Sequence, residues 1–320
     1  MTQYFLGVDG GQSSTTAIVG DQHGNLLGWG TDGPCNHVAR AAEGRTKFLR
    51  VIGNCIAQAC RVANIARGLS TPEFEAACFG MSGGPDDKRE LLTELLNTPH
   101  LEVTNDAMIA LAGAHSGQPG IIVIAGTGSI AYGCNSQGEV ARAGGWGYIF
   151  GDEGGSFDIA RQALRAILRE HEGWGPRTAL TPALLAFAEA AEANDLLHRF
   201  YTADWPRHRV ATLSKLVNEI AEQGDPAAQQ ILERAAQELA TLASSVKHQI
   251  FNETDSIAVA YVGGAFQSEL LRDRFRLLVE LSGNTDCKAP DHSPAIGALY
   301  RAYRASGLSP ILKNTSSLKT

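Results

Sequence analysis

One short construction occurs twice in this chain. In the first copy a β-prone run at residues 5–8 leads into the turn DGGQSS at residues 9–14, and a second β-prone run follows at 15–19. In the second copy the apolar run 121–125, the turn GTGS at 126–129 and the run 130–134 follow one another in the same way. A strand, a turn of glycine and hydroxyl residues, and another strand in each half of the chain indicate a weak internal duplication.

The rest of the pattern predicts an α/β protein. Residues 4–8, 15–19 and 26–31 are typical of three antiparallel strands, since turn-forming residues separate them. Helical and β-prone segments then alternate, and helical segments predominate after Gly155. We expect helices at about 38–66, 86–96, 157–170, 182–193, 207–222, 226–251, 268–281 and 294–305, and another that begins at 107. Further strands are expected at about 74–81, 101–104 and 257–262. The tail at about 313–320 is expected to be disordered.

The length predicts two domains. A chain of 320 residues exceeds the ~250–300 residues at which a single hydrophobic core stops growing. We expect an N-terminal α/β domain at residues 1–117, with the first turn, and a larger C-terminal α/β domain at 118–320, with the second. The last helix, at about 294–306, belongs to the C-terminal domain in this division; packing on the N-terminal domain is the alternative.

Charge and cysteine usage exclude several classes. The net charge is −7, whereas binding to nucleic acid or an anionic membrane depends on clustered Lys and Arg, so we expect neither partner. No run reaches the ~18 apolar residues of a membrane span, and no basic leader is present, which predicts a cytoplasmic protein. The six cysteines show no CxxC pair and no zinc-ligand spacing, which predicts free thiols.

Both turns are suited to phosphate. Glycine lets backbone N–H groups point at an anion without interference from a side chain. The chain has no GxxxxGK[ST] loop, and a β-prone run rather than a helix follows the glycines, so Walker and dinucleotide-binding loops are excluded. Two such turns together could hold a triphosphate, and Asp9 could hold Mg²⁺ through its water shell. The alternatives are an ordinary glycine-rich hairpin and a turn role for Asp9.

Three further segments carry candidate chemistry. Asp106 follows the strand expected at 101–104, where a carboxylate can act as a general base or cap the next helix. The runs GGWG at 144–147 and GDEGG at 151–155 combine flexible backbone, an aromatic face and carboxylates, which are features of sugar-binding sites. The alternative is a glycine-rich loop followed by acidic residues at the start of a helix. Gly263 and Gly264 could let a flat ring or ribose approach the backbone, or could simply open a helix.

The ordered set of motifs resembles a known superfamily. The chain contains, in order, the segments DGGQSSTTAIV, FGMSGG, VTNDA, IAGTGSIAYG, GGWGYIFGDEGGSFDIA and AYVGGAF. This set resembles the sugar kinase/actin/heat-shock-chaperone superfamily, and the resemblance extends over about residues 6–300. Within it, they are similar to the N-acetylglucosamine kinases that group with the activator ATPases of benzoyl-CoA reductase and hydroxyglutaryl-CoA dehydratase.

The resemblance implies two ribonuclease-H-like domains around a cleft that holds ATP, Mg²⁺ and a sugar, in a homodimer. It implies that Asp106 is the catalytic base. It assigns the nucleotide to Asp9, Gly10, Gly11, Gln12, Ser13, Ser14, Gly126, Thr127, Gly128, Gly263 and Gly264. It assigns the sugar to Asn36, His37, Asp106, Ser129, Gly145, Trp146, Gly147 and Asp152.

The function expected on these grounds is ATP-dependent phosphorylation of N-acetylglucosamine or glucosamine at the 6-hydroxyl. One alternative is an activator ATPase, whose relatives hold an iron–sulfur cluster with cysteines from each subunit; Cys78 and Cys134 show no such paired arrangement. The other alternative is a sugar sensor without enzymatic activity.

Overall fold

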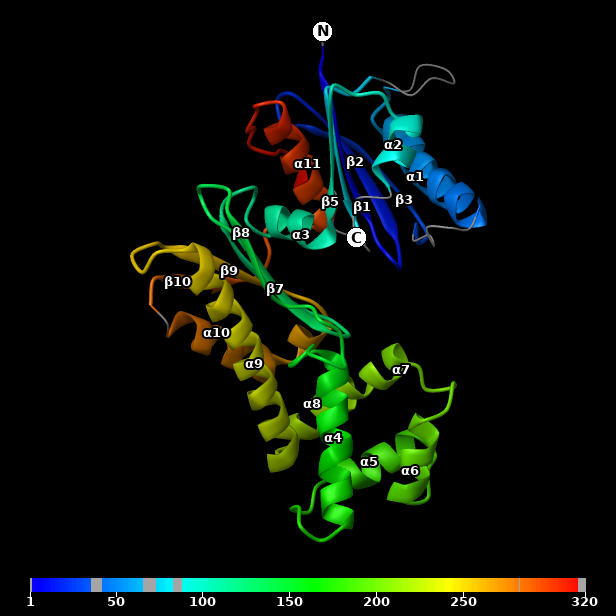
Figure 1. Cartoon of the computed structure of the whole chain (residues 1–320), viewed down its shortest axis with the longest axis vertical. Coiled ribbons are helices and arrows are strands. Elements are labelled where there is room, and N and C mark those ends of the chain that lie inside the picture. Colours follow the sequence, from blue (N-terminus) through cyan, green and yellow to red (C-terminus); the bar gives the residue numbers. More distant parts are fainter. Residues whose placement is uncertain (1, 36–41, 66–72, 83–87, 282, 316–320) are drawn as a thin grey trace. The chain divides into compact units, whose positions relative to one another are not determined.

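The computed structural model describes residues 2–35, 42–65, 73–82, 88–281 and 283–315. The chain divides into two compact units, one of Met1–Gln118 with Pro290–Thr320 and one of Pro119–Ala289. Each unit is built on a five-stranded mixed sheet with helices (Figure 1). The α/β class predicted from the sequence is therefore confirmed.

The first unit begins with the three antiparallel strands that the sequence predicts. Its sheet has the order β3-β2-β1-β4-β5, in which β1, β2 and β3 pair antiparallel and β4 and β5 continue from β1 in parallel. The strands are β1 (Tyr4–Gly10), β2 (Thr15–Asp21), β3 (Leu26–Asp32), β4 (Ala76–Met81) and β5 (His100–Asn105). The helices are α1 (Ala42–Val62), α2 (Arg89–Leu95), α3 (Asp106–Ala114) and α11 (Pro294–Ala305).

Helices cover both faces of the first sheet. Side chains alternate across a strand, so Leu6 and Val8 of β1 join an apolar cluster with α1, whereas Phe5 joins a second cluster with α3 and α11. Tyr303 of α11 packs on Phe5 at 4.5 Å between ring centroids and donates a hydrogen bond to the Asp21 carbonyl at 2.8 Å. The C-terminal helix is thus part of the core of this unit.

The second unit repeats the topology of the first. Its sheet has the order β8-β7-β6-β9-β10, with antiparallel pairs among β6, β7 and β8 and parallel pairs from β6 through β9 to β10. The strands are β6 (Gly120–Ala125), β7 (Ser129–Cys134), β8 (Val140–Gly144), β9 (Ile257–Val262) and β10 (Thr285–Lys288). Strand for strand, the pairing matches that of the first unit, which confirms the internal duplication predicted from the two turns.

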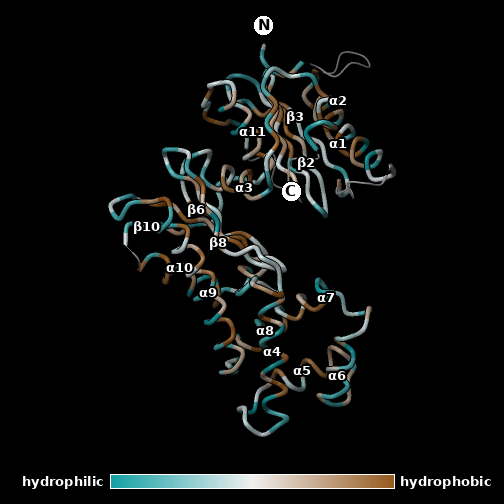
Figure 2. The backbone as a smooth tube through the Cα atoms, in the orientation of Figure 1, coloured by the Kyte–Doolittle hydropathy of each residue, from teal (hydrophilic) through white to brown (hydrophobic). Residues whose placement is uncertain are grey.

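Helices inserted between β8 and β9 enlarge the second unit. The long helix α9 packs on β6, β7 and β8, α10 packs on β10, and α4, α7 and α8 pack together. One apolar cluster joins the strands and these helices, and Figure 2 shows hydrophobic residues along the strands of both sheets. The helices are α4 (Ser156–His171), α5 (Leu180–Phe187), α6 (Ala193–Phe200), α7 (Arg207–Ala211), α8 (Leu213–Glu222), α9 (Pro226–Ile250), the short 3₁₀ helix η1 (Gly264–Gln267) and α10 (Glu269–Glu280).

Several expected elements differ from the structure. The helix expected at 182–193 is wrong, because Glu189 adopts a left-handed φ of 53° beyond the end of α5, and α6 starts only at Ala193. The helix expected at 207–222 is interrupted at Thr212. The short strands β8 and β10 were not predicted. Lys313, expected to be disordered, forms a parallel bridge with Asn25.

Candidate active site

The first turn joins β1 to β2 and presents its tip to solvent. The Gly11 N–H donates to the Ser14 carbonyl at 3.0 Å, and Gln12, Ser13 and Ser14 are exposed. Gly10, in contrast, is buried as the last residue of β1. The exposed part of the predicted phosphate site is therefore residues 12–14, behind which β1 carries Asp9.

Asp106 begins a helix, but it does not cap that helix. The cap of α3 is Asn105, whose side-chain oxygen accepts a hydrogen bond from the Met108 N–H at 2.9 Å. The alternative that Asp106 is an N-cap is therefore wrong. Its exposed carboxylate lies in the first turn of α3, at the carboxyl end of parallel strand β5, and accepts a hydrogen bond from the Ser82 hydroxyl at 2.8 Å. Sequence reasoning missed Ser82, although it lies in the quoted motif FGMSGG.

Asp9 and Asp106 are electrostatically coupled. Burial, first, and the negative charge of Asp106, second, raise the pKa of the Asp9 carboxyl from 3.8 to about 6. A buried carboxyl that lies in the field of a second acid creates a demand for a cation. The described residues contain no group of three or more His, Cys, Asp or Glu side chains that could hold a metal. The Asp9 and Asp106 carboxylates fit a hydrated Mg²⁺, which takes few protein carboxylates and keeps several waters.

The second turn is fixed to the start of helix α4. The Gly126 N–H donates to the Gly128 carbonyl at 3.0 Å, which closes the turn. The Ser156 and Phe157 N–H groups donate to the Gly126 and Thr127 carbonyls at 2.8 and 3.1 Å. These bonds occupy the carbonyls of the turn, which favours an anion over a cation as its ligand.

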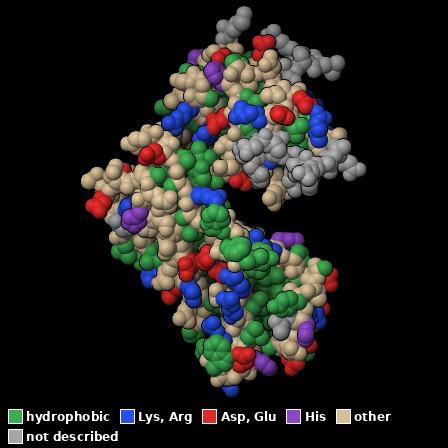
Figure 3. Space-filling view, viewed as in Figure 1, with side chains coloured by type: hydrophobic (Ala, Val, Ile, Leu, Met, Phe, Trp, Pro, Cys, Tyr) green, Lys and Arg blue, Asp and Glu red, His purple; other side chains and the backbone are tan. Residues whose placement is uncertain are grey.

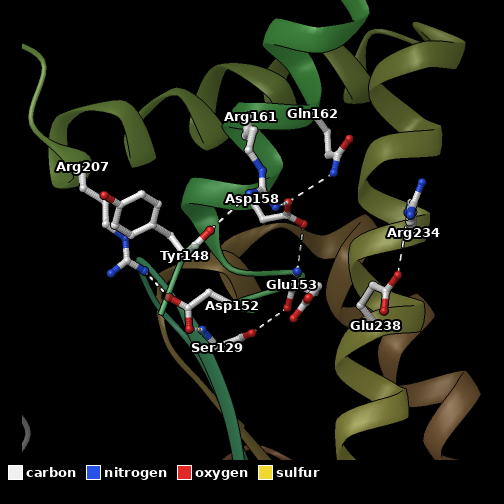
Figure 4. A network of polar contacts seen from close by, with 11 residues as sticks. Ser129, Tyr148, Asp152, Glu153, Asp158, Arg161, Gln162, Arg207, Arg234 and Glu238 are labelled. Carbon is white, nitrogen blue, oxygen red and sulfur yellow. Dashed lines mark hydrogen bonds and ion pairs between the residues drawn. The ribbon is translucent and has the colours of Figure 1, made fainter. Parts of the chain in front are cut away.

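An ion pair between a buried carboxylate and a half-buried arginine supports the second turn (Figure 4). Asp152, at a left-handed φ of 66°, accepts a hydrogen bond from the Ser129 N–H at 3.4 Å, and its other carboxylate oxygen pairs with Arg207 of α7. A side-chain carbon at Gly128 would overlap this carboxylate, so only glycine fits there. Sequence reasoning placed Asp152 and Ser129 near a ligand, but it missed Arg207, which lies 55 residues further along the chain.

The glycine-rich run folds back beside the second turn. Gly144, Gly145 and Gly147 all have φ between 72° and 80°, which glycine adopts without strain. The Gly145 N–H donates to the Ser129 carbonyl at 2.9 Å. Trp146 is 64% exposed, with the Arg142 guanidinium 4.5 Å from its ring centroid. It is one of several large hydrophobic side chains at the surface, where such groups are visible in Figure 3.

The third predicted glycine motif borders a cavity in the second unit. Gly263 has a φ of 115°, and a side-chain carbon on it would overlap the Ala125 carbonyl at the end of β6. Gly264 lines a cavity of about 120 Å³. The polar lining includes Ser214 and Asn218 of α8, which sequence reasoning missed because α8 carries no motif.

The remaining predicted residues are Asn36 and His37, which lie outside the described residues. All six cysteines are free thiols, as predicted. In the part of the chain that the structure describes, no helix is long and apolar enough to cross a membrane.

Comparison with known proteins places these two sheets and their turns in a family. Residues 6–302 match the BadF/BadG/BcrA/BcrD ATPase family, and the chain belongs to it. The family resemblance inferred from the motifs is therefore confirmed.

Similar proteins in this family are named as amino-sugar kinases. An N-acetylmuramic acid/N-acetylglucosamine kinase of Clostridium acetobutylicum is 32% identical over 88% of this chain and 91% of its own. An N-acetyl-D-glucosamine kinase of Dictyostelium discoideum is 31% identical over 95% and 98%. A Chromobacterium violaceum structure, assigned as an N-acetylglucosamine kinase, matches with a TM-score of 0.70 at 26% identity over 93% and 98%.

Proposed function

We propose that the protein is an ATP-dependent amino-sugar kinase that phosphorylates N-acetylglucosamine or glucosamine at the 6-hydroxyl. The observation that carries the proposal is Asp106, an exposed carboxylate that is oriented by Ser82 and is not used as a helix cap. The relatives named above support the substrate class. A glucosamine kinase of Vibrio cholerae is 28% identical over 55% of this chain and 58% of its own. This relative supports the free amine as an alternative to the acetylated sugar.

Asp106 would act as the general base. Phosphoryl transfer requires mainly positioning and charge stabilisation, and the attacking hydroxyl must lose its proton. In this role the Asp106 carboxylate takes the proton of the sugar hydroxyl, whose oxygen bonds to the γ-phosphorus of ATP while the bond to ADP breaks. The Ser82 hydroxyl donates to one carboxylate oxygen, which holds the other oxygen in a fixed direction for the proton.

The remaining groups would bind the substrates. The turns at residues 9–14 and 126–129 would contact the phosphates, Asp9 would hold Mg²⁺ through water, and the cavity beside Gly264 would take the adenosine. The magnesium ion would supply charge neutralisation of the phosphates. For the sugar we retain the predicted set, namely Asn36, His37, Asp106, Ser129, Gly145, Trp146, Gly147 and Asp152.

An activator ATPase is disfavoured by the position of one of its two candidate cysteines, Cys78. Cys78 is fully buried in β4, and burial raises the pKa of its thiol far above the ordinary value. A thiol held protonated in this way is a poor cluster ligand, because metals bind the thiolate.

The test is an ADP-release assay on the purified protein with Mg·ATP. N-acetylglucosamine, glucosamine, N-acetylmuramic acid, glucose and no sugar are compared at equal concentration. We expect amino sugars to stimulate ADP release far above the rate without sugar, and phosphorus NMR of the product to show a 6-phosphate. ADP release that no sugar increases would refute the proposal.

A further inference from the structure

A buried carboxylate lies directly beside the second turn. Asp152 accepts the Ser129 N–H at 3.4 Å and occupies the space where a Gly128 side chain would lie. Only 8% of its side chain is exposed. Because water barely reaches it, its charge is weakly screened. Without compensation, this charge would repel an anion bound at the turn.

Arg207 supplies the compensating charge from outside every glycine-rich motif. It is the first residue of α7 and pairs with the Asp152 carboxylate oxygen that does not accept the Ser129 N–H (Figure 4). Its guanidinium carbon lies 5.1 Å from the ring centroid of Tyr148 and 5.7 Å from that of Phe157. Cation–π contacts of this kind attract a guanidinium to the ring faces. Together with the ion pair, they favour a position of the Arg207 cation beside Asp152.

We propose that Arg207 sets the nucleotide affinity of the second turn by neutralising Asp152. The inference rests on the proposed function, because it takes nucleotide phosphate as the anion at the turn. The Gly126 and Ser129 N–H groups already donate to the Gly128 carbonyl and to Asp152. With the ion pair intact, the other backbone N–H groups of the turn can attract phosphate without opposition from a net negative charge. When the cation is removed, a buried carboxylate remains unpaired and opposes the phosphate. Arg207 is thus a positioning residue that acts electrostatically through Asp152.

The test compares the affinity for Mg·ADP of wild type, Arg207→Met and the double variant with Asp152→Asn, measured by calorimetry without sugar. Arg207→Met removes the charge but keeps an apolar stem, and we expect ADP to bind about tenfold more weakly, the scale of one close charge interaction. This deficit should largely persist as salt is raised, because the buried carboxylate is weakly screened. The double variant Arg207→Met/Asp152→Asn should bind within about threefold of wild type, because the coupling between the two sites is then absent.

Two further variants separate charge from packing. Arg209→Met is the matched control, because Arg209 lies on the same helix but stacks on Trp205 at 4.2 Å and donates to the Asp204 carbonyl at 2.6 Å. It loses the same net charge and should bind ADP like wild type. Arg207→Lys keeps the charge and loses the planar fork, so it should also bind ADP almost as wild type does. This variant preserves the test if Arg207→Met does not fold.

The outcomes are distinguishable. A double variant that binds ADP as weakly as Arg207→Met would show that packing, not charge, is what Arg207 provides. Equal losses in Arg207→Lys or in Arg209→Met would also overturn the inference. A wild-type protein that binds no ADP would instead overturn the proposed function.

Discussion

Replacing Asp9 by Asn should stabilise the first unit at alkaline pH. Burial and the Asp106 charge raise the pKa of the Asp9 carboxyl from 3.8 to about 6. A carboxyl whose pKa is higher in the folded than in the unfolded state favours folding while it is protonated. This stabilisation is fully present below the unfolded-state pKa and is lost as the pH rises through the folded-state pKa of about 6. At pH 8 the ionised side chain therefore lowers the free energy of unfolding.

The magnitude follows from the size of the shift. A rise from 3.8 to about 6, at about 1.4 kcal/mol per pH unit, amounts to about 3 kcal/mol at pH 8. Asn has nearly the same shape and no charge, so Asp9→Asn should recover this free energy at pH 8 and change little near pH 4. In a domain of roughly 150 residues, 1 kcal/mol corresponds to about 2–4 °C, so the melting temperature should rise by roughly 6 °C or more.

The assay is urea unfolding at pH 4, 6 and 8 without nucleotide or Mg²⁺, for wild type and Asp9→Asn. The control is Asp32→Asn, because a hydrogen bond from the Asn54 amide lowers the pKa of the Asp32 carboxyl. That carboxylate stabilises the fold above its unfolded pKa, so its removal should bring no gain at pH 8. An Asp9→Asn variant no more stable than wild type at pH 8 would refute the reasoning.

The same variant should lose function while it gains stability. A carboxylate that holds a metal through water typically contributes about 10–100-fold to metal affinity. Titration of Mg²⁺ in the kinase assay should therefore show a half-maximal concentration shifted upward by about that factor in Asp9→Asn. An unshifted titration would place the metal elsewhere.

Three other substitutions test separate parts of the site. Asp106→Asn should lower kcat by about 10²–10⁴-fold without lowering the melting temperature, since Asn105 caps α3; a variant with most of its turnover would exclude Asp106 as the base. Gly128→Ala should lower stability by about 1–3 kcal/mol in urea unfolding, because the added carbon overlaps the Asp152 carboxylate, and an unchanged midpoint would contradict that packing. Trp146→Ala should raise the KM for the sugar and leave ADP affinity unchanged in calorimetry; the reverse pattern would remove Trp146 from the sugar site.

The sequence was most informative where local chemistry determines structure. Both turns were predictable, because glycine and hydroxyl residues between β-prone runs form hairpins whatever surrounds them. Strands β8 (VARAG) and β10 (TDCK) could not be predicted in this way, because their residues have little intrinsic preference for β structure. They are strands because neighbouring strands pair with them. The duplication itself could have predicted both, because β3 and β5 occupy the same places in the first sheet.

The site was predictable only where its residues belong to motifs. Asn105 and Asp106 are both good caps, so the sequence could not decide which one begins α3; the backbone fixes the boundary and frees the Asp106 carboxylate. Arg207 had no signal at all, because its role depends on tertiary contacts that bring α7 to Asp152. A charged residue on an amphipathic helix usually faces solvent. Only the buried partner Asp152 distinguishes Arg207 from such surface residues.

The two turns share a topology but differ in electrostatics. At the first turn the carboxyl of Asp9 has a raised pKa, and no Lys, Arg or His among the residues the structure describes pairs with it. At the second turn the carboxylate of Asp152 is paired with Arg207. A duplicated hairpin would be expected to carry the same charges twice, yet only one of the two carboxylates has a cationic partner within the described part of the chain. Because Asp152 is offset by Arg207, the second turn can accept an anion, whereas the charge beside the first turn favours a cation. One charge pair is thus enough to make two turns of the same topology electrostatically different.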